Sequence, residues 1–266
     1  MLLGIGAVVA IVLLGLCVWY YGYHTVVKAP PGMVYIPAGW FRMGCSTSDK
    51  SCFDFDGEKP YHRVYLNAFF IDRNDVTVGD YSRCVHAGRC TPPHWNDCYI
   101  WAGGWKKGTA SPALQESNKP VVCVDWTQST TYCTWQGKHL PSEAQWEKAA
   151  RGTDGKIYPW GNTWDPSKAC FNQQSTCAVG SHPQGSSAYG VLDMAGNVWQ
   201  WCSDWYSTDY YSKSPDHNPQ GPDRGQFRVL RGGSWFDLIP AKLRTSYRNG
   251  SAPSYALFNH GFRCAR

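Results

Sequence analysis

The sequence predicts an irregular, loop-rich α+β domain at residues 33–266, preceded by one transmembrane helix. Three features of its 266 residues indicate this class. The 27 Gly and 17 Pro interrupt long periodic segments, so long helices are not the main theme. Aromatic residues make up 15% of the chain, and so many rings exclude a disordered chain because they bury against one another. Charged residues reach only 17%, whereas an average globular chain has about 25% and a coiled coil more.

The first segment, residues 2–21, is interpreted as an uncleaved membrane anchor. It contains no charged residue and ends in aromatic residues that match a membrane-interface belt. Its length matches the about 20 residues that a helix needs to cross a bilayer. No basic residue precedes Lys28 and no small-x-small site follows, as a cleaved signal would require, and Leu16 before Cys17 disfavours a lipoprotein signal. The predicted organisation is an anchor with its flank, a linker and one domain, at residues 1–28, 29–32 and 33–266.

Strands are expected where short apolar runs are bounded by Gly, Pro or Asp. These runs are Val34–Ile36, Gly39–Met43, Arg63–Ile71 and Arg228–Leu230. Long segments rich in Gly, Pro and Asn are predicted to be loops, chiefly Cys90–Pro120 and Tyr158–Gly190.

Three helices are predicted. The first, Thr77–His86, follows Asp75 as the expected N-cap, and the second covers Trp126–Gln136. The third, Ser142–Arg151, follows Pro141, starts with the capping-box pattern Ser142 to Gln145 and ends at Gly152.

The twelve cysteines indicate an oxidising compartment, because reduced cytosolic proteins rarely carry so many. None forms a C-x-x-C pair, and none of the eight His lies at metal-ligand spacing from a Cys. Three short brackets are typical of disulfides in surface loops: Cys45 with Cys52, Cys84 with Cys90, and Cys170 with Cys177. The domain is therefore expected on the periplasmic or extracellular side of the membrane.

Several function classes are disfavoured. The net charge of +5 is spread along the chain without a basic run, so no nucleic-acid partner is expected. The sequence also lacks the glycine-rich phosphate-binding motifs and the motifs of serine hydrolases and kinases.

The segment at residues 190–206 offers oxygen atoms at regular spacing. The side chains of Asp193 and Gln200 and the carbonyls of Gly196 and Val198 would surround a hard cation such as Ca²⁺. A Gly-Asn turn between core Trp residues explains the same pattern, and spacing alone favours this turn because only Asp193 carries a full charge.

Seven segments occur in an order that carries a family resemblance: YIPAGWFRMG, EKPYHRVYLNAFFIDRNDVTVGDY, PVVCVDWTQSTTYCTWQGKHLPSEAQWEKAARG, YPWGN, GVLDMAGNVWQW, RVLRGGSW and GFRCAR. Over residues 33–266 the chain resembles the formylglycine-generating enzyme (sulfatase-modifying factor) family. The resemblance implies a single domain with little regular structure, related to the C-type lectin-like fold. Active members oxidise a substrate cysteine to formylglycine with O₂ and copper held by two cysteines.

The two copper-binding cysteines of the family are missing here. They follow the RGGS motif, and by spacing from Ser234 their places are taken by Asp237 and Lys242. Soft Cu(I) prefers thiolates, which a carboxylate and an ammonium do not replace, so neither copper nor a catalytic residue is expected. The cleft implied by the resemblance still offers polar and aromatic groups to a ligand: Trp199, Arg231, Ser234, Asp237 and Arg263.

Other family features carry over residue by residue. The resemblance places a calcium site at Asp193, Gly196, Val198 and Gln200, with Asp where the family often has Asn and Gln where it has Glu. It implies a disulfide between Cys133 and Cys264, which ties the central helix to the C-terminus. Cys45–Cys52 and Cys170–Cys177 are the next expected pairs. The pairing of Cys84, Cys90, Cys98 and Cys123 stays open, and Cys17 and Cys202 are left unpaired.

The leading hypothesis is a membrane-anchored, extracytoplasmic, non-catalytic interaction module, such as an accessory subunit of a membrane protein complex. Its expected partners are other membrane or extracytoplasmic subunits, and residues 2–21 would hold it in the membrane. One alternative is an enzyme with an altered active site, in which Asp237 or Cys202 supports another oxidation or a hydrolysis. A second alternative is a lectin-like domain that binds carbohydrate through exposed aromatic rings.

Overall fold

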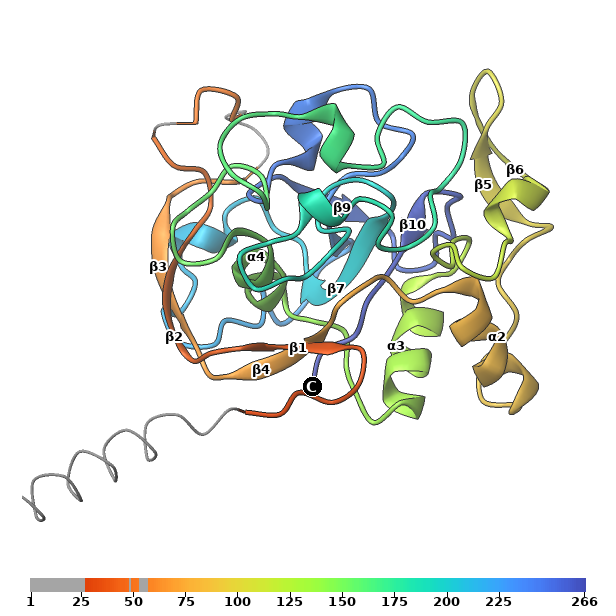
Figure 1. The fold of residues 1–266 in the computed structure, drawn as a ribbon, viewed down its shortest axis with the longest axis horizontal. Coiled ribbons are helices and arrows are strands. Elements are labelled where there is room, and N and C mark those ends of the chain that lie inside the picture. Colours follow the sequence, from red (N-terminus) through yellow and green to blue (C-terminus); the bar gives the residue numbers. More distant parts are fainter. Residues whose placement is uncertain (1–26, 48, 53–56) are drawn as a thin grey trace, which may run out of the picture.

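A computed structural model describes residues 27–47, 49–52 and 57–266 (Figure 1). The anchor predicted at residues 2–21 lies outside these residues. Among the described helices, none has the length and apolar character needed to span a membrane. The described chain mixes a few short helices with short strands and long loops, which confirms the predicted loop-rich fold with mixed helix and sheet.

Two small antiparallel sheets are formed by the first four strands. β1 (Met33–Ile36) pairs with β4 (Phe69–Asp72), and β2 (Gly39–Met43) pairs with β3 (His62–Leu66). The single strand predicted at Arg63–Ile71 is wrong, because the chain leaves β3 at Asn67 and enters a different sheet at Phe69. The backbone N–H of Asn67 donates to the side chain of Asn218 instead of to a neighbouring strand, at 2.8 Å.

The central sheet has four strands in the order β10-β7-β8-β9. They are β10 (His260–Gly261), β7 (Trp199–Trp205), β8 (Arg228–Arg231) and β9 (Arg248–Ser251). β10 runs parallel to β7, and the other neighbours are antiparallel. Only β8 was anticipated from the sequence, as Arg228–Leu230.

The part of the chain that the structure describes contains three α-helices: α2 (Val78–His86), α3 (Trp126–Trp135) and α4 (Glu143–Arg151). The predicted capping box of Ser142 and Gln145 forms, and α4 ends at Gly152, whose φ of 69° suits a residue without a Cβ. The N-cap expected at Asp75 is wrong. Thr77 caps α2 by accepting from the N–H of Asp80 at 3.0 Å, because only Thr77 lies next to the first turn.

The segment predicted as a loop at Cys90–Pro120 contains a hairpin of β5 (Cys98–Trp101) and β6 (Trp105–Gly108), which protrudes from the body of the domain (Figure 1). Short 3₁₀ turns complete the described elements, at Pro112–Leu114, Pro166–Lys168, Pro183–Gly185, Tyr210–Ser212 and Pro240–Leu243.

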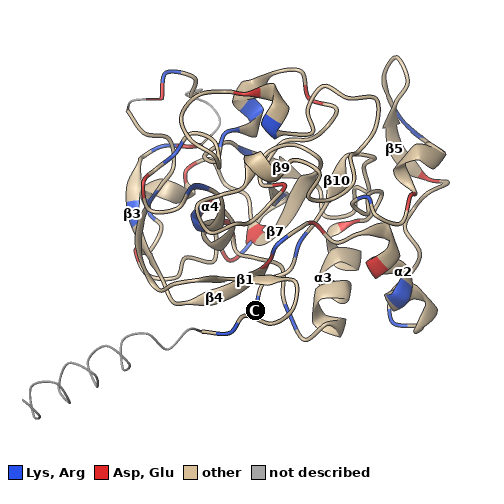
Figure 2. Ribbon diagram, viewed as in Figure 1, with Lys and Arg blue, Asp and Glu red and all other residues tan. Residues whose placement is uncertain are grey.

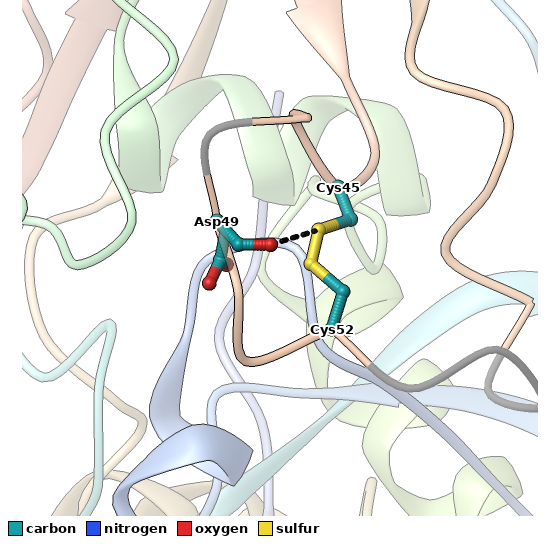
Figure 3. A group of neighbouring side chains, drawn as sticks. All are labelled: Cys45, Asp49 and Cys52. Carbon is teal, nitrogen blue, oxygen red and sulfur yellow. Dashed lines mark hydrogen bonds between the residues drawn. A yellow bond between two sulfur atoms is a disulfide. The ribbon is translucent and has the colours of Figure 1, made fainter.

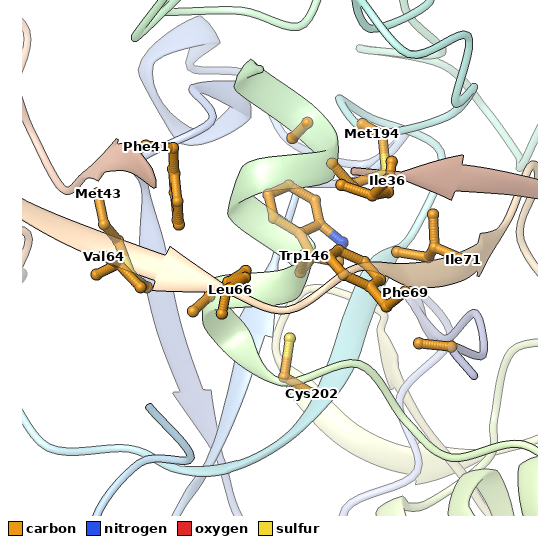
Figure 4. Close-up of a cluster of buried hydrophobic side chains, with 14 of the residues drawn as sticks. Ile36, Phe41, Met43, Val64, Leu66, Phe69, Ile71, Trp146, Met194 and Cys202 are labelled. Atoms are coloured by element: carbon orange, nitrogen blue, oxygen red, sulfur yellow. The ribbon is translucent and has the colours of Figure 1, made fainter. Parts of the chain in front are cut away.

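The largest hydrophobic cluster packs around Trp146 of α4 (Figure 4). Apolar side chains of β1 to β4 surround this ring, and Met194 and Cys202 approach from the central segments. The helix α4 is buried on several faces and joins the sheets β1–β4 and β2–β3 to the central sheet. Eight of the nine residues of α4 are buried accordingly.

Five disulfides connect the described segments: Cys45–Cys52, Cys84–Cys90, Cys98–Cys123, Cys133–Cys264 and Cys170–Cys177. They include the three pairs expected from the sequence, and they assign the four cysteines whose pairing was open. Cys133–Cys264 ties α3 to the C-terminus across 131 residues.

Acidic and basic residues are interspersed along the ribbon (Figure 2), and many of the charges are internal. Five arginines are fully buried: Arg151, Arg231, Arg244, Arg248 and Arg263. Each donates to backbone carbonyls or to buried carboxylates. A guanidinium carries five N–H donors, so a few arginines satisfy many loop carbonyls that lack a strand or helix partner.

Candidate functional site

A cleft of about 400 Å³ opens on the central sheet. Its floor includes Trp199 of β7, Leu230 of β8 and Asn249 of β9. The segment that follows the RGGS motif, residues 236–242, forms one wall, and Trp105 of the β5–β6 hairpin forms another. Of the five residues expected to form a ligand cleft, Trp199 and Asp237 line it.

Asp237 follows the RGGS motif and fixes the turn that carries it. One carboxylate oxygen accepts from the backbone N–H and the hydroxyl of Ser234, at 2.9 and 2.7 Å. The other accepts from the ammonium of Lys242 at 3.0 Å. Ser234 is fully buried beneath Asp237, and its hydroxyl also accepts from the amide of Asn259 at 3.2 Å. Asp237 and Lys242 are therefore joined by an ion pair across this turn.

His260 and Asn259 complete the polar part of the cleft wall. Burial lowers the pKa of His260 to about 3, so its imidazole is neutral at pH 7. Neither residue was predicted from the sequence. The GFRCAR motif begins directly after His260, so the position of that motif was a signal that these two residues lie near the site.

Arg231 does not line the cleft, which corrects the prediction. Its guanidinium is fully buried on the other side of β8, where it binds the carboxylate of Glu147 and the carbonyls of Thr245, Ser246 and Tyr247. The alternation of side chains along a strand explains this placement, because the preceding Leu230 is the residue that faces the cleft.

Arg263 is also placed differently from the prediction. It is fully buried and donates to the side chains of Asp75 and Gln200, at 2.9 and 2.7 Å, and to the carbonyls of Leu192 and Asp193. These contacts anchor the residue 192–200 segment to the start of α2. They also explain why Asp75 does not act as the helix cap.

The donor set expected for calcium does not fit a cation in this arrangement. The side-chain oxygen of Gln200 accepts from the indole N–H of Trp146 and from Arg263, both at 2.7 Å. Tryptophan and arginine are donors only, so this amide orientation is fixed. Its amide nitrogen donates to the carbonyl of Asp193 at 2.7 Å. Gln200 thus has its oxygen occupied and a guanidinium beside it, which opposes a divalent ion.

The other two calcium candidates lie in the tight turn between these residues. The N–H of Gly196 donates to the carbonyl of Gly232 at 2.8 Å. A Cβ at Gly196 would come within 2.4 Å of the carbonyl of Cys170. Val198 is fully buried in a core cluster, with its side chain close to Gly261. These contacts are those of a tightly packed Gly-Asn turn between core Trp residues, which is the alternative interpretation of this segment.

Cys202 lies buried in the hydrophobic cluster around Trp146 (Figure 4), and it does not line the cleft. Burial and the carboxylates of Asp204 and Glu143 raise the pKa of its thiol well above the usual value. A reactive cysteine needs the opposite shift and access to solvent, so this thiol is not set up as a nucleophile.

Cys45, Asp49 and Cys52 form the one cluster of potential metal ligands among the described residues, with ligand atoms within 4.8 Å of one another. The two sulfurs are joined in a disulfide (Figure 3), so neither is a thiolate that binds metal. Arg244 donates to both Asp49 and Cys52 and adds a positive charge that disfavours a cation.

The chain belongs to the family described as the sulfatase-modifying factor enzyme 1-like domain, whose model matches residues 23–266. The formylglycine-generating enzyme of Streptomyces coelicolor is 34% identical over 289 residues, which cover 90% of each chain. The serine/threonine-protein kinase Pkn1 of Chlamydia trachomatis is 38% identical over 244 residues. That match covers 88% of this chain and only 38% of the kinase, so the present chain spans a minor part of that relative.

A solved structure, that of PvdO from Pseudomonas aeruginosa, has the same fold. The two superpose with a TM-score of 0.75 at 28% identity, over 90% of this chain and 99% of PvdO. The family resemblance seen in the sequence motifs is therefore confirmed for the whole domain.

Proposed function

We propose that this chain is a non-catalytic interaction module of the formylglycine-generating enzyme family, which binds a ligand in the cleft at Asp237. The observation that carries the proposal is the ion pair between Asp237 and Lys242, at the two positions where active members hold copper with thiolates. Both oxygens of Asp237 accept hydrogen bonds, one from Ser234 and the other from Lys242, and these bonds close a turn.

The proposal includes a location and a class of partner. Five disulfides suit an oxidising compartment, which supports a domain on the periplasmic or extracellular side, anchored by residues 2–21. A protein fixed at a membrane surface meets other membrane or extracytoplasmic subunits, and these are the proposed partners. Purification through the intact anchor in mild detergent should recover such subunits in fixed stoichiometry.

The test of lost chemistry uses the full chain in mild detergent. Incubation with copper, O₂ and a cysteine-containing sulfatase peptide is expected to give no aldehyde, and the purified protein should contain no stoichiometric copper. The matched variant carries Asp237→Cys with Lys242→Cys, and it should acquire the ultraviolet absorption of a Cu(I)–thiolate site. Robust formylglycine formation by the unaltered chain would refute the proposal. Stoichiometric copper or iron in that chain would support the alternative, an enzyme with an altered active site.

A further inference from the structure

One border of the cleft carries an Asn-Gly sequence on an open sheet edge. Asn249 and Gly250 belong to β9, and both line the cleft. Within the described residues β9 pairs with β8 on one side only, so its other edge has no strand partner there. Asn249 is exposed, whereas Arg248 before it and Ser251 after Gly250 are buried. The carboxamide of Asn249 is therefore accessible to water at the wall of the cleft.

The contact between these two residues brings a nitrogen nucleophile next to a carbonyl carbon. The backbone N–H of Gly250 donates to the side-chain oxygen of Asn249 at 2.8 Å. The carboxamide carbon of Asn249 is bonded directly to that oxygen, so the Gly250 nitrogen lies beside this carbon. Within the described chain this is the one hydrogen bond of the Asn249 side chain, so no second contact prevents the carboxamide from turning its carbon toward the nitrogen.

The packing around β9 favours glycine at position 250. A Cβ there would come within 3.0 Å of the ring of Tyr206 and 3.1 Å of the Cβ of Phe227. A residue without a Cβ also leaves its own nitrogen unshielded and gives the backbone the freedom to close a small ring. The contacts that favour glycine at this position therefore also maintain the reactive Asn-Gly sequence.

We propose that Asn249 is a site of spontaneous deamidation, which adds a negative charge to the cleft. The Gly250 nitrogen gives its proton to hydroxide and bonds to the carboxamide carbon, and the –NH₂ group takes up a proton and leaves as ammonia. The product is a cyclic succinimide. Water then breaks one of its two carbonyl–nitrogen bonds, which leaves aspartate or isoaspartate at position 249. In total one water is consumed and one ammonia is released, without any oxidation or reduction.

The new carboxylate changes the charge of the cleft. The charged side chains that line the cleft are Asp237 and Lys242, which pair with each other at 3.0 Å. The imidazole of His260, which also lines it, is neutral at pH 7. Among these lining residues, a carboxylate at position 249 has no cation of its own, so the cleft wall becomes negative. The deamidated chain should therefore bind anionic ligands more weakly than the intact chain.

The experiment incubates the full chain in mild detergent, at neutral and at alkaline pH, in water enriched in oxygen-18. Peptide mass spectrometry should show the loss of the Asn249 amide, the uptake of one labelled oxygen and the appearance of both aspartate and isoaspartate. The rate should rise in proportion to the hydroxide concentration. Two asparagines of the same chain are controls. Asn172 is exposed but precedes Gln173, and Asn197 is buried with both side-chain polar atoms bonded to Cys177. Both should stay intact while Asn249 converts.

Two variants separate the ring closure from other causes. Asn249→Gln should show no conversion over the same time, because its longer side chain has to close a larger ring. Gly250→Ala should slow the conversion several-fold, and its Tm reports whether the contact with Tyr206 alters the fold. The proposal is overturned if Asn249 of the native chain stays intact for as long as the urea-unfolded chain needs to convert. It is also overturned if no labelled oxygen is taken up, or if Asn172 reacts as fast as Asn249.

Discussion

Replacing Glu147 by Gln should strongly destabilise the domain. The side chain of Glu147 is fully buried, and its carboxylate accepts from Arg231, from Arg151 at 2.6 Å and from the N–H of Gly44 at 2.8 Å. Glutamine keeps the shape but removes the charge between two buried guanidinium groups and turns one acceptor into a donor. Breaking one partner of a buried ion pair costs about 3–5 kcal/mol. In a domain of this size each kcal/mol lowers Tm by about 2–4 °C, so the expected fall is on the order of 10 °C.

The assay is thermal and urea unfolding of the Glu147→Gln variant beside the unaltered chain. The control is Glu116→Gln, because Glu116 is 57% exposed and its ion pair with Lys119 lies at the surface. An exposed pair contributes less than about 1 kcal/mol, so the control should barely change Tm. Equal effects of the two substitutions would refute the reasoning that the buried ion pairs of Glu147 stabilise the packing of α4 against the sheets.

Three further predictions concern buried groups. Burial and the neighbouring Glu143 raise the pKa of Asp204 to about 7; the stability that its proton contributes is present at low pH and lost as pH rises through 7. Asp204→Asn should therefore reduce the loss of Tm between pH 5 and pH 8. Burial lowers the pKa of His260 to about 3. The stability that its neutral ring contributes is therefore present above the ordinary pKa of histidine and is lost as pH falls toward 3. The NMR signals of this imidazole should stay those of the neutral ring at pH 5. Cys133→Ser with Cys264→Ser opens a loop of 131 residues, which the chain-entropy model values at about 5 kcal/mol, and urea unfolding should show a loss of several kcal/mol.

Local contacts made parts of the fold predictable from the sequence. The capping box of Ser142 and Gln145 involves residues three apart, and it forms as expected. The short strand Gly39–Met43 was also bounded correctly by its flanking residues. In contrast, β7 was missed because its neighbours β8 and β10 are distant in the sequence, and its Trp-rich run lacks a clear alternation of apolar and polar residues.

The candidate site was only partly predictable for a related reason. Sequence motifs identified the segment that carries Asp237, but not the direction of the charged side chains near it. Arg231 and Arg263 were expected in the cleft, whereas each has a buried carboxylate partner far away in the sequence, Glu147 and Asp75. Trp105 was missed because it lies in a Gly-rich segment, and only the folded hairpin brings it to the cleft.

The ion pair between Lys242 and Asp237 ties together two points of the cleft wall that follows the RGGS motif. The contact is 3.0 Å long, and Ser234 holds the second oxygen of Asp237. In the proposed function these two residues stand where active relatives hold copper with thiolates, so a hard, hydrogen-bonding pair would keep the shape of the cleft and offer a ligand different chemistry. A shared fold therefore supports the inference of a shared cleft, but the groups that line it decide what the cleft binds and whether it reacts.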